Sequence, residues 1–180
     1  PGLYIPSLFL PDYEAGGRFR ALESLFQGHD RVVRAVASDM EASPFPLCQI
    51  TPLIKPVHDR VVVEIGRGCS RGCRFCQAGY IYRPVRERRQ ETIMKLAGCN
   101  LKNSGQDEVS FLSLSAGDHT QISSLVSRFR DDYAAQTVAL SLPSLSVTSL
   151  SGPLAAQIRR VRHTCLPLAP EAGRTRLWNV

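Results

Sequence analysis

The alternation of strand-like and helix-like segments after residue 60 limits the fold more than any other feature of this sequence. A β-branched run ended by glycine, RVVVEIG at 60–66, is typical of a buried strand. The alternation continues as helix 89–105, strand 107–115, helix 118–133, strand 136–142, helix 151–162 and strand 163–170. Such a series predicts an α/β fold with parallel strands and outer helices, joined by right-handed crossovers.

The length of the series bears on how complete the fold is. Four strand–helix units are too few to close an α/β barrel, which needs about 200–250 residues. The sequence starts at Pro1 without a methionine and stops within the pattern at Val180. We therefore expect residues 60–180 to be the N-terminal part of a larger barrel, truncated after about four units.

Residues 1–59 have a different composition. They hold seven of the twelve prolines, and the run SPFPLCQITPLIKP at 43–56 excludes a regular helix or a central strand. Val32, Val33 and Val36 lie at helical spacing after Asp30, which predicts one short helix there. We interpret residues 1–59 as the tail of an upstream domain and its Pro-rich linker.

Composition excludes several classes of protein. No apolar run approaches the roughly 18 residues of a membrane helix, and the first residues lack the basic start of a secretory signal. Six cysteines without such a signal argue against a disulfide scaffold and favour a reducing compartment, so we expect a cytoplasmic protein without membrane contact.

Positive charge is concentrated in one window. Residues 67–89 contain seven arginines and one acid, Glu87, so this window carries the net charge of the whole chain, +6 at pH 7. An arginine run is either a solvated face or a positive wall beside an anionic cluster, cofactor or nucleic acid. Its confinement disfavours nucleic-acid binding over the whole surface.

Half of the six cysteines lie inside that window. They fall within a stretch of eight residues, in GCSRGCRFCQAG at 68–79. Cys69, Cys73 and Cys76 have the spacing Cys-x3-Cys-x2-Cys, and thiolates bind zinc, copper(I) and iron–sulfur clusters. A structural zinc prefers four ligands, whereas three thiolates on a four-iron cluster leave one iron open. The other cysteines are isolated and are interpreted as small buried side chains: Cys48, Cys99 and Cys165.

The segment CSRGCRFC resembles the signature of the radical S-adenosylmethionine (radical SAM) superfamily. The sequence from VHDRVVVEIGRGCSRGCRFCQAGYIYRPVRERR through SFLSLSAGD to LAPEAG is similar to a less characterised branch of it. That branch has an upstream cobalamin-binding-like domain before a partial (βα)6 barrel. The resemblance therefore implies a partial radical SAM-type (βα) barrel.

The resemblance also implies an enzyme and its cofactors. Cys69, Cys73 and Cys76 would hold a [4Fe–4S] cluster whose open iron binds S-adenosylmethionine (SAM), with Phe75 near the adenine. Reductive cleavage of SAM would give a 5′-deoxyadenosyl radical that removes hydrogen from a substrate. A reductant such as flavodoxin or ferredoxin would supply the electron.

Two further segments carry expected contacts to SAM. Where the superfamily often has Gly-Gly-Glu, this chain has Ser115-Ala116-Gly117-Asp118, so Ser115, Gly117 and Asp118 would face the amino group of SAM. Asp118 is alternatively the cap of the next helix. In LAPEAG, Glu171 would contact SAM or substrate, or else stabilise the first turn of a helix.

Other interpretations stay open at this stage. The cysteines could belong to a zinc-binding structural module, or the chain could be a non-catalytic fragment of a larger protein. RPVRERR allows an RNA substrate, and a cobalamin could bind through a domain absent from this sequence. We expect the residues that select the substrate to lie in the missing C-terminal barrel segment or domain.

Overall fold

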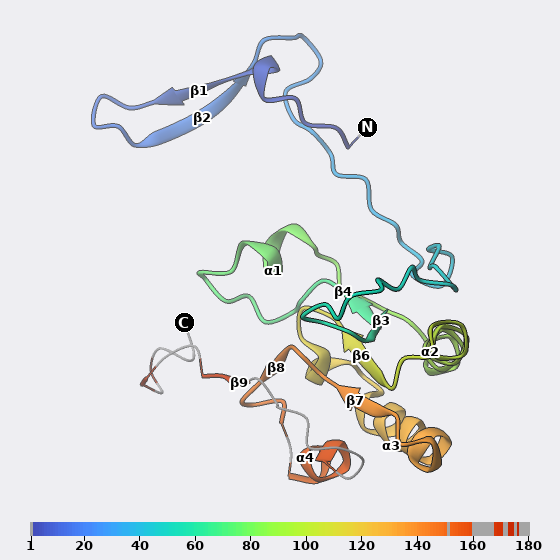
Figure 1. The fold of residues 1–180 in the computed structure, drawn as a ribbon. Coiled ribbons are helices and arrows are strands. Elements are labelled where there is room, and N and C mark those ends of the chain that lie inside the picture. Colours follow the sequence, from blue (N-terminus) through green and yellow to red (C-terminus); the bar gives the residue numbers. More distant parts are fainter. Residues whose placement is uncertain (1, 151, 160–167, 171–172, 175, 177–180) are drawn as a thin grey trace. The chain divides into compact units, whose positions relative to one another are not determined.

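The computed structural model describes residues 2–150, 152–159, 168–170, 173–174 and 176. The chain divides into two compact units, Pro1–Ser38 and Asp39–Val180 (Figure 1). No helix in the described part of the chain is long and apolar enough to cross a membrane.

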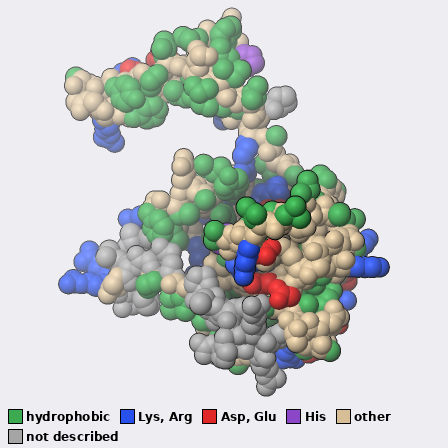
Figure 2. Space-filling model, viewed as in Figure 1, with side chains coloured by type: hydrophobic (Ala, Val, Ile, Leu, Met, Phe, Trp, Pro, Cys, Tyr) green, Lys and Arg blue, Asp and Glu red, His purple; other side chains and the backbone are tan. Residues whose placement is uncertain are grey.

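The first unit is built on an antiparallel hairpin. A 3-10 turn at Pro6–Leu8 leads into β1 (Phe9–Tyr13), which pairs with β2 (Phe19–Ser24). Described residues 30–38 form no helix, so the helix predicted after Asp30 is wrong. Phe9 is buried, whereas many other apolar side chains of this unit lie on its surface (Figure 2).

The second unit contains a three-stranded parallel sheet. Its order is β3 (Val61–Glu64), β6 (Glu108–Leu112) and β7 (Ala139–Ser141). The helices α2 (Gln90–Ser104) and α3 (Ile122–Tyr133) follow β3 and β6 in sequence and lie on one side of the sheet (Figure 1). Each strand and helix predicted between residues 60 and 142 is present, but several are shorter than predicted: β6 ends at Leu112, α3 begins at Ile122 and β7 begins at Ala139.

The remaining elements are short. They are α1 (Gln77–Ile81), α4 (Gly152–Arg159), 3-10 turns at Ala116–Asp118 and Ala134–Gln136, and the strands β4 (Gly66–Arg67), β5 (Arg86–Glu87), β8 (Leu145–Ser146) and β9 (Leu168–Ala169). β4 pairs with β5 in antiparallel orientation, and β8 pairs with β9 in parallel orientation. Residues 163–167 of the last predicted strand lie outside the described residues.

The prediction of a partial (βα) barrel is wrong. A barrel needs consecutive strands that each hydrogen-bond to the next around a ring. In the described residues the parallel sheet stops after β7, and β8 and β9 form a separate two-stranded sheet. The other two sheets are antiparallel pairs. Alternating elements are present, but their strands form small separate sheets instead of one curved surface.

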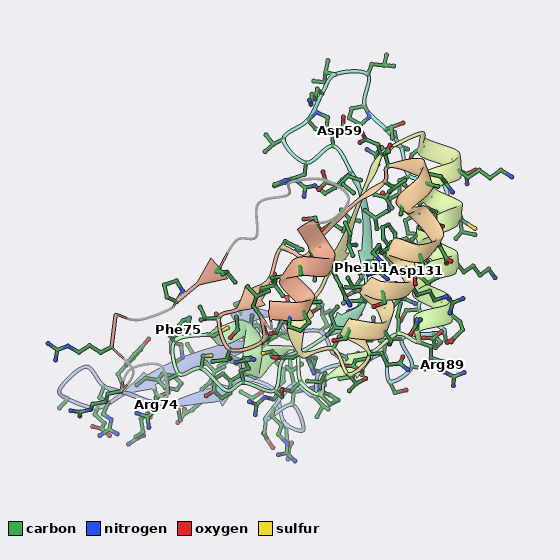
Figure 3. The ribbon with its side chains drawn as sticks, turned by 90° about the horizontal axis from the view of Figure 1, so that it is seen from below. Asp59, Arg74, Phe75, Arg89, Phe111 and Asp131 are labelled. Atoms are coloured by element: carbon green, nitrogen blue, oxygen red, sulfur yellow. The ribbon has the colours of Figure 1, made fainter. Side chains whose placement is uncertain are left out.

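The hydrophobic core lies between the parallel sheet and its helices. Phe111 of β6 is labelled in Figure 3. Its ring packs edge-on against that of Phe129 of α3, with 5.5 Å between ring centroids and an interplanar angle of 82°. The predicted inner face of α2 is buried, namely Ile93, Leu96, Ala97 and Leu101. Gly105 ends α2 with φ of +70°, a left-handed conformation that glycine adopts without strain.

Residues 39–49 lie against α2 at several points. The Glu41 carboxylate accepts hydrogen bonds from the Arg89 N–H (2.6 Å) and the Thr92 hydroxyl at the start of the helix. The buried Asn100 amide donates to the Pro46 carbonyl (3.1 Å), and Asn103 donates to that of Leu47 (2.8 Å). These hydrogen bonds hold residues 39–49, which belong to the second unit, against α2.

Arg88 is the most unusual buried residue of this unit. Its guanidinium donates to three backbone carbonyls, those of Glu64 (3.1 Å), Met40 and Ser43 (3.4 Å), although its side chain is almost fully enclosed. It also lies over the Phe45 ring, 5.8 Å from the centroid. A buried cation needs such partners because desolvation of an unpaired charge is very unfavourable. Arg88 therefore joins the end of β3 to residues 40–45.

We expect Arg88→Met to destabilise the second unit by about 2–4 kcal/mol, because it leaves buried carbonyls without donors. The matched control is Arg89→Met, which changes the same charge at the neighbouring, exposed position and should cost less than about 1 kcal/mol. Denaturant unfolding followed by helical circular dichroism measures both, since all described α-helices lie in this unit. Equal stability of the two variants would contradict the role of Arg88.

Candidate functional site

The cysteine loop, residues 68–76, lies between β4, which closely follows β3, and α1. Gly68 has φ of +94°, and a Cβ there would lie 2.6 Å from the Tyr82 carbonyl oxygen and 2.8 Å from that of Pro84. Only glycine fits this approach, because backbone atoms on the other side cannot move away as a flexible side chain could. The start of the cysteine loop is thus packed directly on residues 82–85.

The three thiols are free and partly exposed. The Arg71 N–H donates to Cys69 Sγ at 3.5 Å, and the Cys76 N–H donates to the Cys73 carbonyl at 3.0 Å. Cys76 immediately precedes α1, and a Cβ on Gly79 would be 3.8 Å from Cys76 Sγ. The three cysteines of this loop are therefore partly accessible from solvent, and one of their sulfurs, Cys69 Sγ, accepts a backbone hydrogen bond.

All three cysteines line one cavity of about 510 Å³. Its other walls come from segments far apart in the sequence, with Phe75 and Arg71 on the cysteine loop, Leu114 and Ser115 after β6, residues 143–148 after β7, and Leu168 and Pro170. The carboxyl ends of parallel strands lie at one edge of a sheet, where ligands of α/β proteins bind. The loops that follow β3, β6 and β7 thus converge on this cavity.

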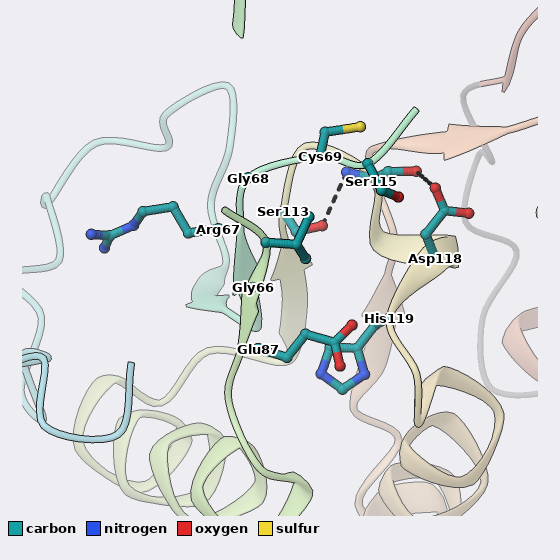
Figure 4. A pocket seen from close by; sticks show the side chains of 11 residues that line it. Gly66, Arg67, Gly68, Cys69, Glu87, Ser113, Ser115, Asp118 and His119 are labelled. Carbon is teal, nitrogen blue, oxygen red and sulfur yellow. Dashed lines mark hydrogen bonds between the residues drawn. The ribbon is translucent and has the colours of Figure 1, made fainter. Parts of the chain in front are cut away.

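A smaller cavity of about 40 Å³ lies beside the large one and shares Cys69 and Ser115 with it. Its walls include Glu87 and His119 (Figure 4). The Ser115 N–H donates to Ser113 Oγ at 3.1 Å, which fixes the turn after β6. The volume has room for a few water molecules.

Arg71 connects the loops around the large cavity. Its Nε and Nη2 donate to the two carboxylate oxygens of Asp118, at 2.5 and 2.6 Å, and its Nη1 donates to Thr148 Oγ1 at 2.7 Å. Ser115 Oγ donates to the same carboxylate at 2.7 Å (Figure 4). Bidentate pairing of this kind is strong and directional. It ties the loop after β3 to those after β6 and β7.

The charges in this group stabilise one another. The hydrogen bond from Arg71 lowers the pKa of Asp118, partial burial opposes the shift, and the Ser115 hydroxyl adds to it. The same hydrogen bond raises the pKa of Arg71, with smaller contributions from Cys69 and Cys73. Both groups are therefore charged at neutral pH.

The structure places the sequence-predicted residues in different surroundings. Phe75, Ser115 and the three cysteines line the large cavity, and Phe75 is 69% exposed there. Gly117 instead packs on the next loop, since a Cβ would lie 2.3 Å from Ser149 Oγ. Glu171 lies outside the described residues.

Two expectations need correction. Asp118 is not a helix cap: α3 begins at Ile122, its N-cap is Gln121, and no side chain caps it. Cys48, expected to be buried, is exposed, while Cys99 is partly buried and Cys165 lies outside the described residues. No three His, Cys, Asp or Glu side chains of the described residues stand close enough to share one metal ion.

His119 is a residue that sequence reasoning missed. It is buried, its Nδ1 accepts the Gln121 N–H at 3.1 Å, and its Nε2 is 3.2 Å from the Arg88 carbonyl. A backbone N–H can only donate, so the ring proton lies on Nε2 and both ring nitrogens are satisfied. His119 therefore supports the start of α3 and shows no sign of being a metal ligand.

Comparison with known proteins identifies an uncharacterised relative of this chain. No protein-family model matches the chain. Over 148 residues the chain is 34% identical to the uncharacterised protein MJ0966 of Methanocaldococcus jannaschii, and the alignment covers 82% of this chain but 32% of that protein. The chain therefore spans about a third of the length of this curated relative.

Proposed function

We propose that this chain is a radical SAM enzyme domain in which Cys69, Cys73 and Cys76 bind a [4Fe–4S] cluster and SAM occupies the adjoining cavity. The observation that carries the proposal is that all three cysteines line one cavity of about 510 Å³. This volume suits a nucleoside-sized ligand. The proposal requires convergent loops after parallel strands and does not require a closed barrel.

The donor set fits an iron–sulfur cluster better than a single zinc ion. A structural zinc needs four ligands around one point, with sulfur about 2.3 Å from the metal, whereas a cubane distributes its thiolates over different irons. The backbone N–H of Arg71 directed at Cys69 Sγ is the kind of contact that tunes cluster potential.

When bound, the cluster and SAM would supply radical hydrogen-abstraction chemistry, which is a property of the cofactors. The chain's own residues would bind and orient them. Phe75 offers an exposed ring on the cavity wall for the adenine, and Leu114 and Leu145 add apolar surface that excludes water. The proposal also includes a substrate from which hydrogen is removed, a reductant such as flavodoxin or ferredoxin that supplies the electron, and a cytoplasmic location.

Asp118 has a different role from the one expected by resemblance. Its carboxylate already accepts three hydrogen bonds, two from Arg71 and one from Ser115, and its charge is paired with that of Arg71, which weakens its attraction for a ligand ammonium group. We assign it to positioning the cysteine loop. Ser115 remains the candidate for contact with the SAM amino group, because it lines the cavity itself.

We expect that Cys69→Ala, Cys73→Ala or Cys76→Ala each abolishes cluster assembly, because a three-thiolate site loses one iron ligand. Iron and sulfide are counted after anaerobic reconstitution of the 180-residue chain. Cys48→Ala and Cys99→Ala are the matched controls and should retain the iron content of the unmodified chain.

Two outcomes would contradict the proposal. Loss of iron from Cys99→Ala equal to that from Cys73→Ala would show that the ligand set is different. A colourless protein that binds stoichiometric zinc through the same cysteines would support the structural zinc module instead.

We expect Asp118→Asn to lower the free energy of unfolding at pH 7 by about 1 kcal/mol, since the paired side chains are partly exposed. The pKa of Asp118 is lowered from 3.8, so its stabilisation is present above that pH and is lost as pH falls through the lower folded value. The difference between the two proteins should therefore vanish in strong acid. Asp131→Asn, at a more exposed ion pair, is the control and should have little effect. A pH-independent difference would contradict this assignment.

A further inference from the structure

An exposed apolar loop precedes β3. We define the apolar loop as residues 50–57, and its four large aliphatic side chains protrude into solvent: Ile50 (99% exposed), Leu53 (106%), Ile54 (80%) and Val57 (91%). We propose that the apolar loop binds the same loop of a second copy of this chain and so forms a symmetric dimer. Neither the cluster nor SAM takes part, so the dimer is tested separately from the proposed function.

The exposure of these side chains is exceptional in the second unit. Elsewhere in its described part, an exposed Leu, Ile or Val side chain reaches 47% at most, at Leu47. Single exposed aliphatic residues are common on protein surfaces, but a group of them marks an interaction site. Four such residues within eight positions therefore indicate a surface that another protein covers.

Hydrogen bonds fix both ends of the apolar loop to the second unit. Before the loop, the Gln49 amide donates to a backbone carbonyl of β3 at 3.3 Å, and after it the Gln106 amide donates to the Asp59 carboxylate at 2.9 Å. Pro52 and Pro56 restrict the backbone dihedral angles in between. A surface that is held in place before binding loses less conformational entropy when a partner docks.

A hollow of about 490 Å³ lies beside the protruding side chains. Its walls are residues 52–57 together with Asp59, Arg60, Asp107 and Glu108. Arg60 is paired with Glu108 at 2.7 Å. Lys55 and Asp59, in contrast, belong to no ion pair within the described part of the chain. The hollow therefore offers one positive and one negative group to a partner.

This surface is complementary to itself. In a two-fold symmetric dimer every contact occurs twice, with the roles of the two copies exchanged. Lys55 of each copy would lie against Asp59 of the other, while the aliphatic side chains pack together and lose their contact with water. The walls of the hollow carry three carboxylates and two cations, so their charges nearly cancel and two copies of the surface do not repel one another strongly.

The proposed interface lies at the opposite edge of the sheet from the cysteine cavity. β3 and β6 are parallel, and the apolar loop and Glu108 lie at their starts, whereas the loops that line the cavity follow their ends. Figure 3 shows Asp59 and Phe75 far apart on the second unit. A dimer formed through the apolar loop therefore leaves the cavity of each copy open.

Sedimentation velocity of the 180-residue chain at about 1–100 µM tests this dimer. We expect a reversible monomer–dimer equilibrium without larger species, because a two-fold contact is closed. Leu53→Asp places a charge in the apolar contact and should raise the Kd of the dimer by about tenfold or more. Val33→Asp is the matched control, at an apolar position of the first unit that is 69% exposed, and should leave Kd unchanged.

An exchange of charges tests the pairing itself. Lys55→Glu and Asp59→Lys each place like charges opposite one another in the dimer, so each variant alone should raise Kd by about tenfold. An equimolar mixture of the two variants contains one pair with exchanged charges and one original pair, so it should dimerise like the unmodified chain. Recovery in the mixture also shows that both variants are folded.

Four outcomes would overturn the proposal. The chain could stay monomeric throughout the concentration range, or it could associate without limit into larger species. Val33→Asp could weaken dimerisation as much as Leu53→Asp does, which would place the interface elsewhere. The mixture of the two charge variants could remain monomeric, which would show that Lys55 and Asp59 do not face each other across the dimer.

Discussion

The buried guanidinium of Arg88 is the interaction on which the arrangement of the second unit depends. Its carbonyl partners come from the end of β3 and from the segment around Met40 and Ser43, while its own carbonyl lies 3.2 Å from His119 Nε2. One residue therefore joins the proline-rich segment, the strand that leads to the cysteines, and the start of α3. The three hydrogen-bond acceptors of this guanidinium are neutral backbone carbonyls, so none of these bonds required a carboxylate to be buried beside the charge.

The candidate site is supported from two sides by such long-range contacts. Arg88 fixes the base of the cysteine loop where β3 ends, and Arg71 fixes its tip to Asp118 and Thr148. Between them, Gly68 allows the backbone to lie directly on residues 82–85. The loop contains little regular structure, yet its position is determined by contacts with four other segments. A ligand in the large cavity would thus meet walls that are already in place.

Local elements could be predicted from this sequence, whereas their assembly could not. The strand at 60–66 and the helix ended by Gly105 follow from side-chain periodicity and a left-handed stop, both of which are local. The prediction of a barrel was wrong because alternation of strands and helices does not fix how many strands join one sheet.

The β1–β2 hairpin was missed because Pro11 argues against a strand, although a strand with a free edge tolerates proline. That the three cysteines share one loop after the first strand follows from their spacing in the sequence, and the cavity they line lies where the loops after the parallel strands meet. The Arg71–Asp118 pair spans 47 residues, and a single sequence carries no signal for it.

The Glu41 carboxylate has a consequence for the order of folding. No side chain of α2 caps its own start, and the N–H of the N-cap residue Arg89 is instead satisfied by a carboxylate from 48 residues earlier in the chain. In a capping box this task falls to a residue in the first turn, so it is completed as the helix nucleates. Here it must wait for closure of a long loop, which is entropically unfavourable. The Arg89 N–H is therefore protected by Glu41 only while residues 39–41 are docked, so its amide hydrogen exchange reports release of that segment.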